Sequence, residues 1–197
     1  MEISRISEKS DTRRGFTTRE LVLSGMFAAV LAVISQISIP LPTGVPVTIQ
    51  VFGIALVGTI LGWRFGLMAT LVYIFLGAVG LPVFANFRGG LNCLVGVTGG
   101  YIWSWPVMAV LSGIRPRVKD KRAELGLRLL LSFTGLAVVE LIGGLQWAAL
   151  SGEMSAGAVF VYSMTAFVPK DIVITAAAVV LGKSFAKRLE TAPINPL

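Results

Sequence analysis

Several stretches of about 20 residues contain few or no charged side chains, and this feature limits the possible folds more than any other. A bilayer core of about 30 Å is crossed by roughly 20 helical residues at 1.5 Å per residue. Apolar windows of about this length lie at residues 21–39, 47–63, 65–87, 89–114, 129–150 and 156–181. The third and fourth include residues typical of loops or re-entrant segments. We therefore expect an all-α, polytopic membrane protein built as a bundle of six transmembrane helices.

The composition agrees with lipid as the main solvent. Hydrophobic residues make up 55% of the 197 residues and charged residues only 14%, and the mean hydropathy is +0.82. These values lie outside the range of soluble domains. The first window is too long for the apolar part of a secretory signal, and no cleavage site follows it. The single cysteine, Cys93, forms no internal disulfide, and we expect it to pack as an apolar residue.

The basic residues indicate how this bundle is oriented. An even number of helices places both termini on one side, and Lys and Arg concentrate on the cytoplasmic side. Fifteen of the 17 basic residues fall on the terminal side: Arg5, Lys9, Arg13, Arg14, Arg19, Arg64, Arg115, Arg117, Lys119, Lys121, Arg122, Arg128, Lys183, Lys187 and Arg188. We expect a cytoplasmic N-terminal arm (1–20), a membrane domain (21–182) and a cytoplasmic tail (183–197). Their dispersal among apolar runs argues against a nucleic-acid surface.

Four charged residues are not explained by topology. Arg88 and Lys170 stand at the predicted outer ends of the third and sixth helices, while Glu140 and Asp171 lie at membrane depth. A charge near the bilayer centre costs about 2.5 to 3.5 kcal/mol, so such residues usually have a partner or a ligand. One interpretation is a binding site. The other is a structural ion pair, such as Arg88 with Asp171, or side chains that reach the headgroups.

The residue types exclude most catalytic chemistry. The chain has no histidine, so it lacks Ser-His and Cys-His pairs, the HExxH zinc motif and any imidazole relay. The tripeptide at 182–184 resembles the end of a P-loop, but Ala177 stands where that motif needs glycine. We therefore predict a non-enzymatic protein without a metal or cofactor of its own. Six helices without a detectable inverted repeat favour a binding subunit over a self-sufficient carrier.

Three segments carry a family resemblance: PVTIQ at 46–50, GLPVFANFRGG at 80–90 and GVTGGY at 96–101. In order and spacing they resemble the BioY family, and the similarity extends from the first helix to FVPKD at 167–171. That family comprises the biotin-specific S components of energy-coupling factor (ECF) importers in bacterial or archaeal cell membranes. The resemblance implies a six-helix bundle that binds biotin from outside and delivers it inward. It also implies two kinds of partner, a transmembrane T subunit and two ATPase subunits that use ATP.

The family's motifs point to particular positions. The resemblance directs attention to Gln50, Asn86, Arg88, Gly99, Gly100, Tyr101 and Asp171. Two departures occur, because Val97 stands where many relatives have proline and Ile174 where many have lysine. We expect Lys170 to supply the amine instead. The predicted biotin-binding residues are therefore Gln50, Asn86, Arg88, Tyr101, Lys170 and Asp171, and the role of Glu140 stays unassigned.

Biotin would need three kinds of partner. Its ureido N–H donors suit the oxygens of Asp171, Asn86 or Gln50. Its carboxylate suits the planar fork of Arg88, and its apolar part suits aromatic walls, for which the candidates are Phe84, Tyr101 and Trp147. Each assignment has an alternative.

Gln50 and Asn86 are also suited to helix caps or turns, and Tyr101 and Trp147 to the membrane belt or the core. The glycines of GGY and RGG equally suit close packing of helices or turns.

The first helix carries small residues at a regular interval. Ala28 and Ala32 form an Ala-x-x-x-Ala step, which lets a second helix approach closely in lipid. The resemblance implies that this face docks on the T subunit, whereas packing inside the chain is the ordinary alternative. Two other functions are compatible with such a membrane protein: an S component for another carboxylate vitamin such as lipoate, and an ion-coupled carrier that works alone.

Overall fold

The computed structural model describes residues 18–152 and 155–191, without the side chains of residues 19–20 and 189–191. Arg5, Lys9, Arg13 and Arg14, and the side chain of Arg19, lie outside the described residues. The elements are α1 (Thr18–Ser35), β1 (Ser38–Ile39), β2 (Val47–Thr48), α2 (Gln50–Leu61), α3 (Trp63–Ala78), the 3-10 helix η2 (Ala85–Phe87), α4 (Leu91–Val95), α5 (Gly99–Gly113), α6 (Lys121–Leu150), α7 (Ala156–Ala166) and α8 (Val168–Thr191).

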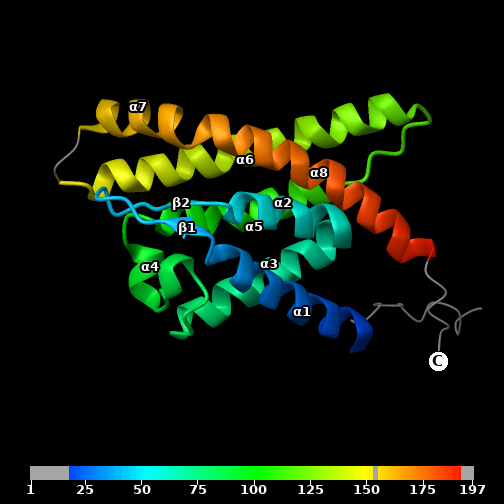
Figure 1. Cartoon of the computed structure of the whole chain (residues 1–197), viewed down its shortest axis with the longest axis horizontal. Coiled ribbons are helices and arrows are strands. Elements are labelled where there is room, and N and C mark those ends of the chain that lie inside the picture. The colour runs from blue at the N-terminus through cyan, green and yellow to red at the C-terminus, as the bar shows by residue number, and fades with distance from the viewer. Residues whose placement is uncertain (1–17, 153–154, 192–197) are drawn as a thin grey trace, which may run out of the picture.

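The chain runs back and forth between two ends of an elongated bundle (Figure 1). From the first described residue, α1 runs toward the left-hand end of that view, α2 returns, and α3 runs left again. The same alternation continues through α5, α6 and the pair α7 and α8. The start of α1, the end of α8 and the α5–α6 connection therefore share one end of the molecule. The short antiparallel strands β1 and β2 and the helix α4 lie at the other end.

Glycines allow α2, α3 and α5 to pack closely. A β-carbon on Gly58 would overlap the carbonyl oxygen of Ala109 in α5, and one on Gly66 would lie 2.8 Å from the Cα of Gly58. Between α2 and α3, Gly62 adopts φ of 81°, a conformation that favours glycine. These small residues bring the helix backbones together where lipid provides no hydrophobic drive between helices.

The long helix α6 and the broken pair α7 and α8 form the other side of the bundle. The side chain of Asp120 caps α6 by accepting from the backbone N–H of Arg122 at 3.0 Å. The axes of α7 and α8 differ by 45° across a break at Phe167. Pro169 explains the break, because it has no N–H to donate to Thr165 four residues earlier and its ring clashes with that carbonyl. The sixth window is therefore irregular, as predicted.

The core lies between the helices, and large apolar side chains cover much of the outside. Residues such as Leu31, Ile54, Met108 and Val139 are at most 2% exposed. On the outer surface, Phe75, Leu130, Val33 and many similar residues are more than 60% exposed. A soluble protein rarely exposes so much apolar surface. This distribution is the one expected for helices surrounded by lipid.

Helix lengths differ from the sequence-based expectation. Every predicted window contains helix, but α2 has 12 residues and α3 has 16, fewer than the expected 20. By length and hydropathy, one described helix (α6) is able to cross a membrane, or two if α7 and α8 count as one bent span. The helices are shorter because glycine and proline end them early, as at Gly62, and because the segment after Ala78 is irregular.

Candidate functional site

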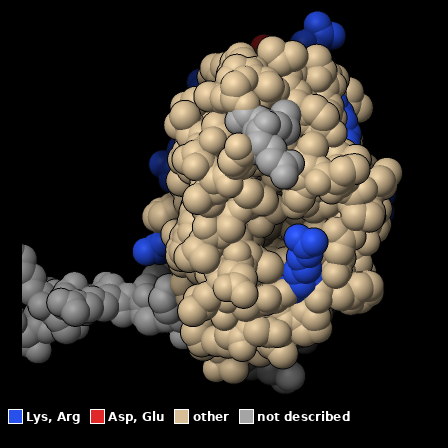
Figure 2. All heavy atoms as spheres, turned by 90° about the vertical axis from the view of Figure 1, so that its left-hand side faces the viewer, with Lys and Arg blue, Asp and Glu red and all other residues tan. Residues whose placement is uncertain are grey.

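A cavity opens among the helices, and its walls come from segments far apart in the sequence. The space between its lining side chains amounts to about 690 Å³, including the part that is open to the outside. The lining residues are Val45, Pro46, Thr48, Gln50, Val51, Phe84, Ala85, Arg88, Cys93, Thr98, Tyr101, Ile102, Trp105, Val139, Glu140, Phe167, Lys170 and Asp171. Figure 2 shows the end of the molecule opposite the described termini as mostly uncharged surface, with a basic side chain beside a hollow.

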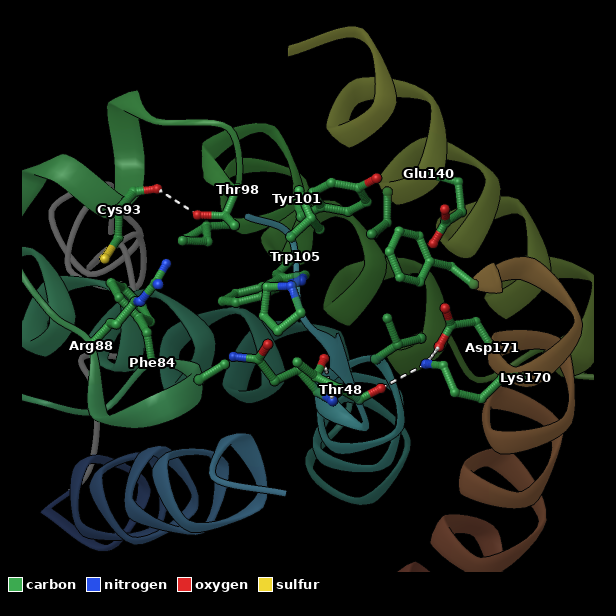
Figure 3. Close-up of a pocket in the computed structure, with 18 residues that line it drawn as sticks. Thr48, Phe84, Arg88, Cys93, Thr98, Tyr101, Trp105, Glu140, Lys170 and Asp171 are labelled. Atoms are coloured by element: carbon green, nitrogen blue, oxygen red, sulfur yellow. Dashed lines mark hydrogen bonds and ion pairs between the residues drawn. The ribbon is translucent and has the colours of Figure 1, made fainter. Parts of the chain in front are cut away.

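The charged residues of this cavity are separated along its length. Figure 3 places Arg88 at one end, beside Phe84 and Cys93, and Lys170 and Asp171 at the other. Among the described residues, no carboxylate pairs with Arg88, so the ion pair between Arg88 and Asp171 that the sequence left open is not formed. The cavity thus offers a guanidinium at one end and a mixed acidic and basic group at the other.

Arg88 is positioned by a loop that other residues hold in place. Its carbonyl oxygen accepts from the N–H of Phe84 at 2.9 Å, which closes the turn around η2. Gln36, just after α1, binds this turn from both sides: its amide donates to the Phe84 carbonyl at 3.2 Å and accepts from the Phe87 N–H at 2.9 Å. Ser35 adds a bond to the carbonyl of Val83. Arg88 itself is exposed, so its guanidinium is accessible from outside.

Lys170 and Asp171 form a hydrogen-bonded ion pair at the start of α8. Lys170 Nζ donates to Asp171 Oδ1 at 2.5 Å and to the backbone carbonyl of Thr48 at 2.6 Å. Asp171 is only 3% exposed. The pair lies here because α8 restarts after the Phe167 break and because the β1–β2 hairpin brings Thr48 against it. The expectation that Lys170 supplies the amine is consistent with this position in the cavity wall.

Gln50 belongs to the cavity wall and does not cap a helix. Its side-chain N–H donates to the hydroxyl of Tyr73 at 3.0 Å, and that hydroxyl donates to the carbonyl of Val83 at 3.0 Å. No side-chain cap bond is formed at the start of α2. The amide is thereby fixed, and its oxygen has no hydrogen bond within the described protein.

Aromatic rings form the apolar walls between the charged ends. Tyr73 packs edge-on against Phe84 with ring centroids 5.6 Å apart and lies stacked at 5.8 Å from Trp105. Tyr101 packs edge-on against Phe167 at 6.4 Å. Phe84 and Tyr101 were predicted as wall residues, while Trp105 and Phe167 were not. Nothing in the sequence distinguishes these two from the other aromatic residues of apolar helices.

Two predicted residues lie elsewhere. Asn86 does not line the cavity: it adopts φ of 58°, and its Oδ1 accepts from the hydroxyl of Ser38 at 2.9 Å. Asparagine tolerates this left-handed conformation, so the residue stabilises the turn that leads to Arg88. Trp147 is fully buried in a second cluster with Val45, Val159 and Phe167. The core alternative therefore describes its position, and not the cavity wall.

The glycines of the GGY segment serve helix packing. A β-carbon on Gly100 would overlap the carbonyl oxygen of Ile142 in α6, and one on Gly99 would overlap that of Leu94. In the RGG segment, Gly90 adopts φ of 95° and Gly89 lies against Leu81. The packing and turn alternative thus describes these positions.

The small residues of α1 do not all face the same way. Ala28 is fully buried in the core, and Ala32 packs against that core. Gly25 and Ala29, also four residues apart, are exposed, and nothing lies within 4 Å of the place where a β-carbon on Gly25 would be. A docking surface on this helix would therefore use the face of Gly25 and Ala29.

The comparisons with known proteins agree with one another. Residues 7–191 match the family model described as the BioY family. The chain is 37% identical over 166 residues to the "Probable biotin transporter BioY" of Pyrococcus horikoshii, covering 84% of this chain and 94% of that protein. It is 40% identical over 125 residues to the "Biotin transporter BioY" of Thermotoga maritima, covering 64% of this chain and 72% of that protein.

A solved structure has a similar fold. It is described as the S-component for biotin from an ECF-type ABC transporter. The TM-score is 0.74 at 24% sequence identity, and the alignment covers 88% of this chain and 95% of the other. At that identity the similarity establishes the fold.

Proposed function

The chain belongs to the BioY family, and on this basis we propose that it is the biotin-binding S component of an ECF-type ABC importer. The observation that carries the proposal is the cavity itself, which has Arg88 at one end, the Lys170–Asp171 pair at the other and aromatic walls between. Biotin has the complementary order of groups: a carboxylate, an apolar chain with a thiophane ring, and a ureido ring.

Arg88 is the proposed partner of the biotin carboxylate. A guanidinium binds a carboxylate through two parallel hydrogen bonds and stays charged at any working pH. Within the described residues no acidic group competes for it. Because Arg88 is exposed, its guanidinium is accessible to an incoming anion.

The ureido ring is proposed to lie at the other end. Asp171 accepts from a ureido N–H, and the Lys170 ammonium, held by Asp171 and Thr48, donates to the ureido carbonyl. The thiophane and its chain then lie against Phe84, Trp105 and Tyr101. We assign Gln50 a contact through its amide oxygen, since its N–H is already bonded to Tyr73.

The proposed topology has six membrane passes with both termini in the cytoplasm of a bacterial or archaeal cell. Its support is the shared end of α1 and α8 and the 15 basic residues assigned to that side. α4 with α5 and α7 with α8 would each make one pass with an interruption. The protein would then present its cavity outward, and partner ATPases would supply the energy for release inward.

We propose that the protein docks on the T subunit through the exposed face of α1 that carries small residues. Gly25 and Ala29 are exposed, and a flat face of this kind permits close helix contact in lipid. Ala28 and Ala32, the residues first predicted for this role, contribute to the internal side of the same helix.

The deciding experiment is isothermal titration of biotin into the detergent-purified protein and into Arg88→Ala and Asp171→Asn. We expect each substitution to weaken binding by roughly 10- to 100-fold, the cost of losing a charged hydrogen-bond partner. Arg117→Ala, an exposed arginine outside the cavity, is the matched control and should bind like the wild type. Equal affinity of all variants would disprove the site.

Two further measurements separate the other functions. Tighter binding of lipoate than of biotin would change the ligand while keeping the architecture. Biotin uptake into proteoliposomes that contain only this chain and an ion gradient would identify a stand-alone carrier.

A further inference from the structure

Glu140 is a buried carboxylate that the roles assigned so far do not use. It lies in the middle of α6, is 8% exposed, and its Oε2 is buried without a hydrogen-bond partner. The side chain borders the cavity, and Figure 3 shows its carboxylate turned toward that of Asp171. An ionised group in this position is strongly unfavourable unless something pairs with it.

The neighbouring groups of the protein do not satisfy Glu140. The ammonium of Lys170 is already bonded to Asp171 and to the Thr48 carbonyl. The hydroxyl of Tyr101, on the adjacent wall, is likewise buried without a partner. This end of the cavity therefore holds two carboxylates, each with several acceptor lone pairs, against one engaged cation and one hydroxyl donor, which leaves hydrogen-bond acceptors in excess.

No hydrogen bond to Glu140 is formed on its opposite side either. There it borders an apolar groove between α6 and the pair α7 and α8; Ser163 is the one other polar side chain among the described residues that line it, and its buried hydroxyl makes no hydrogen bond to Glu140. Among the described residues, no group of three or more His, Cys, Asp and Glu is arranged to hold a metal ion. The missing partner is therefore expected to be a hydrogen-bond donor that enters from the cavity.

We propose that Glu140 is a ligand-binding residue that accepts one of the two ureido N–H groups of biotin, while Asp171 accepts the other. This inference rests on the proposed function. A cyclic urea carries two N–H donors on opposite sides of its carbonyl, so full pairing requires two separate acceptors. Glu140 on α6 and Asp171 on α8 supply them from two helices. A bound urea then supplies the hydrogen-bond donor that the Glu140 carboxylate lacks within the described protein.

The test compares variants with ligands that lack one donor. Glu140→Leu removes the acceptor, Glu140→Gln keeps a weaker neutral one, and Glu124→Gln changes the glutamate at the far end of the same helix as a control. Each is titrated with biotin and with its two derivatives methylated on one or the other ureido nitrogen. For biotin we expect Glu140→Leu to weaken binding by roughly 10- to 100-fold and Glu140→Gln by less.

The derivatives identify the contact. For one of the two methylated ligands, the dissociation constant of Glu140→Leu divided by that of the wild type should fall to about 1. In that ligand the N–H group that donates to Glu140 is already absent, so removing the acceptor has no further effect. The control variant should bind all three ligands like the wild type. Without ligand, Glu140→Leu should melt at a higher temperature than the wild type, since it removes a buried polar group that has no hydrogen-bond partner within the described protein.

The inference is overturned if both Glu140 variants bind biotin as tightly as the wild type. It is also overturned if their affinity falls by the same factor for all three ligands. A lower melting temperature of both ligand-free variants would also overturn it, because Glu140 would then have a structural role. These results leave the proposed function intact. If the wild type binds no biotin, both the function and the inference fail.

Discussion

Replacement of Lys170 by methionine tests how the ion pair in the cavity is stabilised. Lys170 Nζ donates two short hydrogen bonds, to Asp171 and to the Thr48 carbonyl. Removing one partner of a fully buried pair costs about 3 to 5 kcal/mol, because the other charge stays buried and unpaired. The Lys170 side chain is 27% exposed and that of Asp171 is 4% exposed. Partial screening of the lysine places the expected loss near the lower limit, about 3 kcal/mol.

The second variant and the double variant show whether the loss comes from the pair. Asp171→Asn keeps an amide oxygen for Lys170 and should cost less, about 1 to 2 kcal/mol. The double variant, which carries both Lys170→Met and Asp171→Asn, retains no buried charge from the pair. We therefore expect the double variant to be more stable than the sum of the single losses predicts, by about 1 to 2 kcal/mol.

Reversible unfolding in mixed micelles with increasing denaturing detergent would measure the free energy of unfolding of the four proteins. Lys119→Met, at an exposed lysine in the α5–α6 connection, is the control and should change it by less than about 0.5 kcal/mol. Strictly additive losses, or a loss below about 1 kcal/mol for Lys170→Met, would refute the view that the pair is buried and coupled.

Three further predictions follow from other parts of the fold. Ala29→Trp should leave biotin binding unchanged and abolish uptake in vesicles that contain the T and ATPase subunits. Ala28→Trp, in the core, should instead lower the melting temperature. The reverse pattern would show that Ala28, and not Ala29, lies on the docking face. Gln36→Leu should weaken biotin binding roughly tenfold, as judged by titration, because it frees the loop that positions Arg88; unchanged affinity would show that the loop is held without it. A hydrogen bond from Lys183, together with the nearby Arg128, lowers the pKa of Glu124 from its usual 4.5. The Glu124 carboxylate therefore stabilises the fold at pH values above its pKa in the unfolded chain. This stabilisation is lost as the pH falls through the lower pKa of the folded protein. At neutral pH the free energy of unfolding of the wild type should be greater than that of Glu124→Gln by up to about 1 kcal/mol. A difference in this free energy that persists in strong acid would contradict the prediction.

The general character of the fold could be predicted from the sequence because hydropathy is a local property. In lipid, backbone polar groups must bond within the chain, so a long apolar segment becomes a helix. Each predicted window does contain helix. The boundaries were less accurate: α2 is much shorter than its window, and the segment after α3 forms a turn and a 3-10 helix. Those limits depend on close packing, such as that of Gly58 against Ala109, which the sequence does not display.

The candidate site was predicted in part for a similar reason. Charges within or at the ends of apolar windows are conspicuous, so Arg88, Lys170 and Asp171 could be identified without a structure, and Gln50 and Tyr101 came from the family resemblance. All five line one cavity. For Trp147 the sequence left the wall and the core open, and the structure has it in the core; Asn86 lies in the turn beside the cavity. The sequence could not decide these positions because the direction of a side chain depends on what packs against its backbone.

The sequence alone thus determined that the chain is helical, that it suits lipid, and that a few charged residues require partners. Only the tertiary structure decided which residues meet: it brings Lys170 against Thr48, 122 positions earlier, and turns Glu140 toward Asp171 from a different helix. It also decided which side of α1 is internal, since that helix is apolar all round and has no polar face to indicate its orientation. The physical reason is that burial and pairing are properties of distances in space, which neighbouring positions along the chain do not specify.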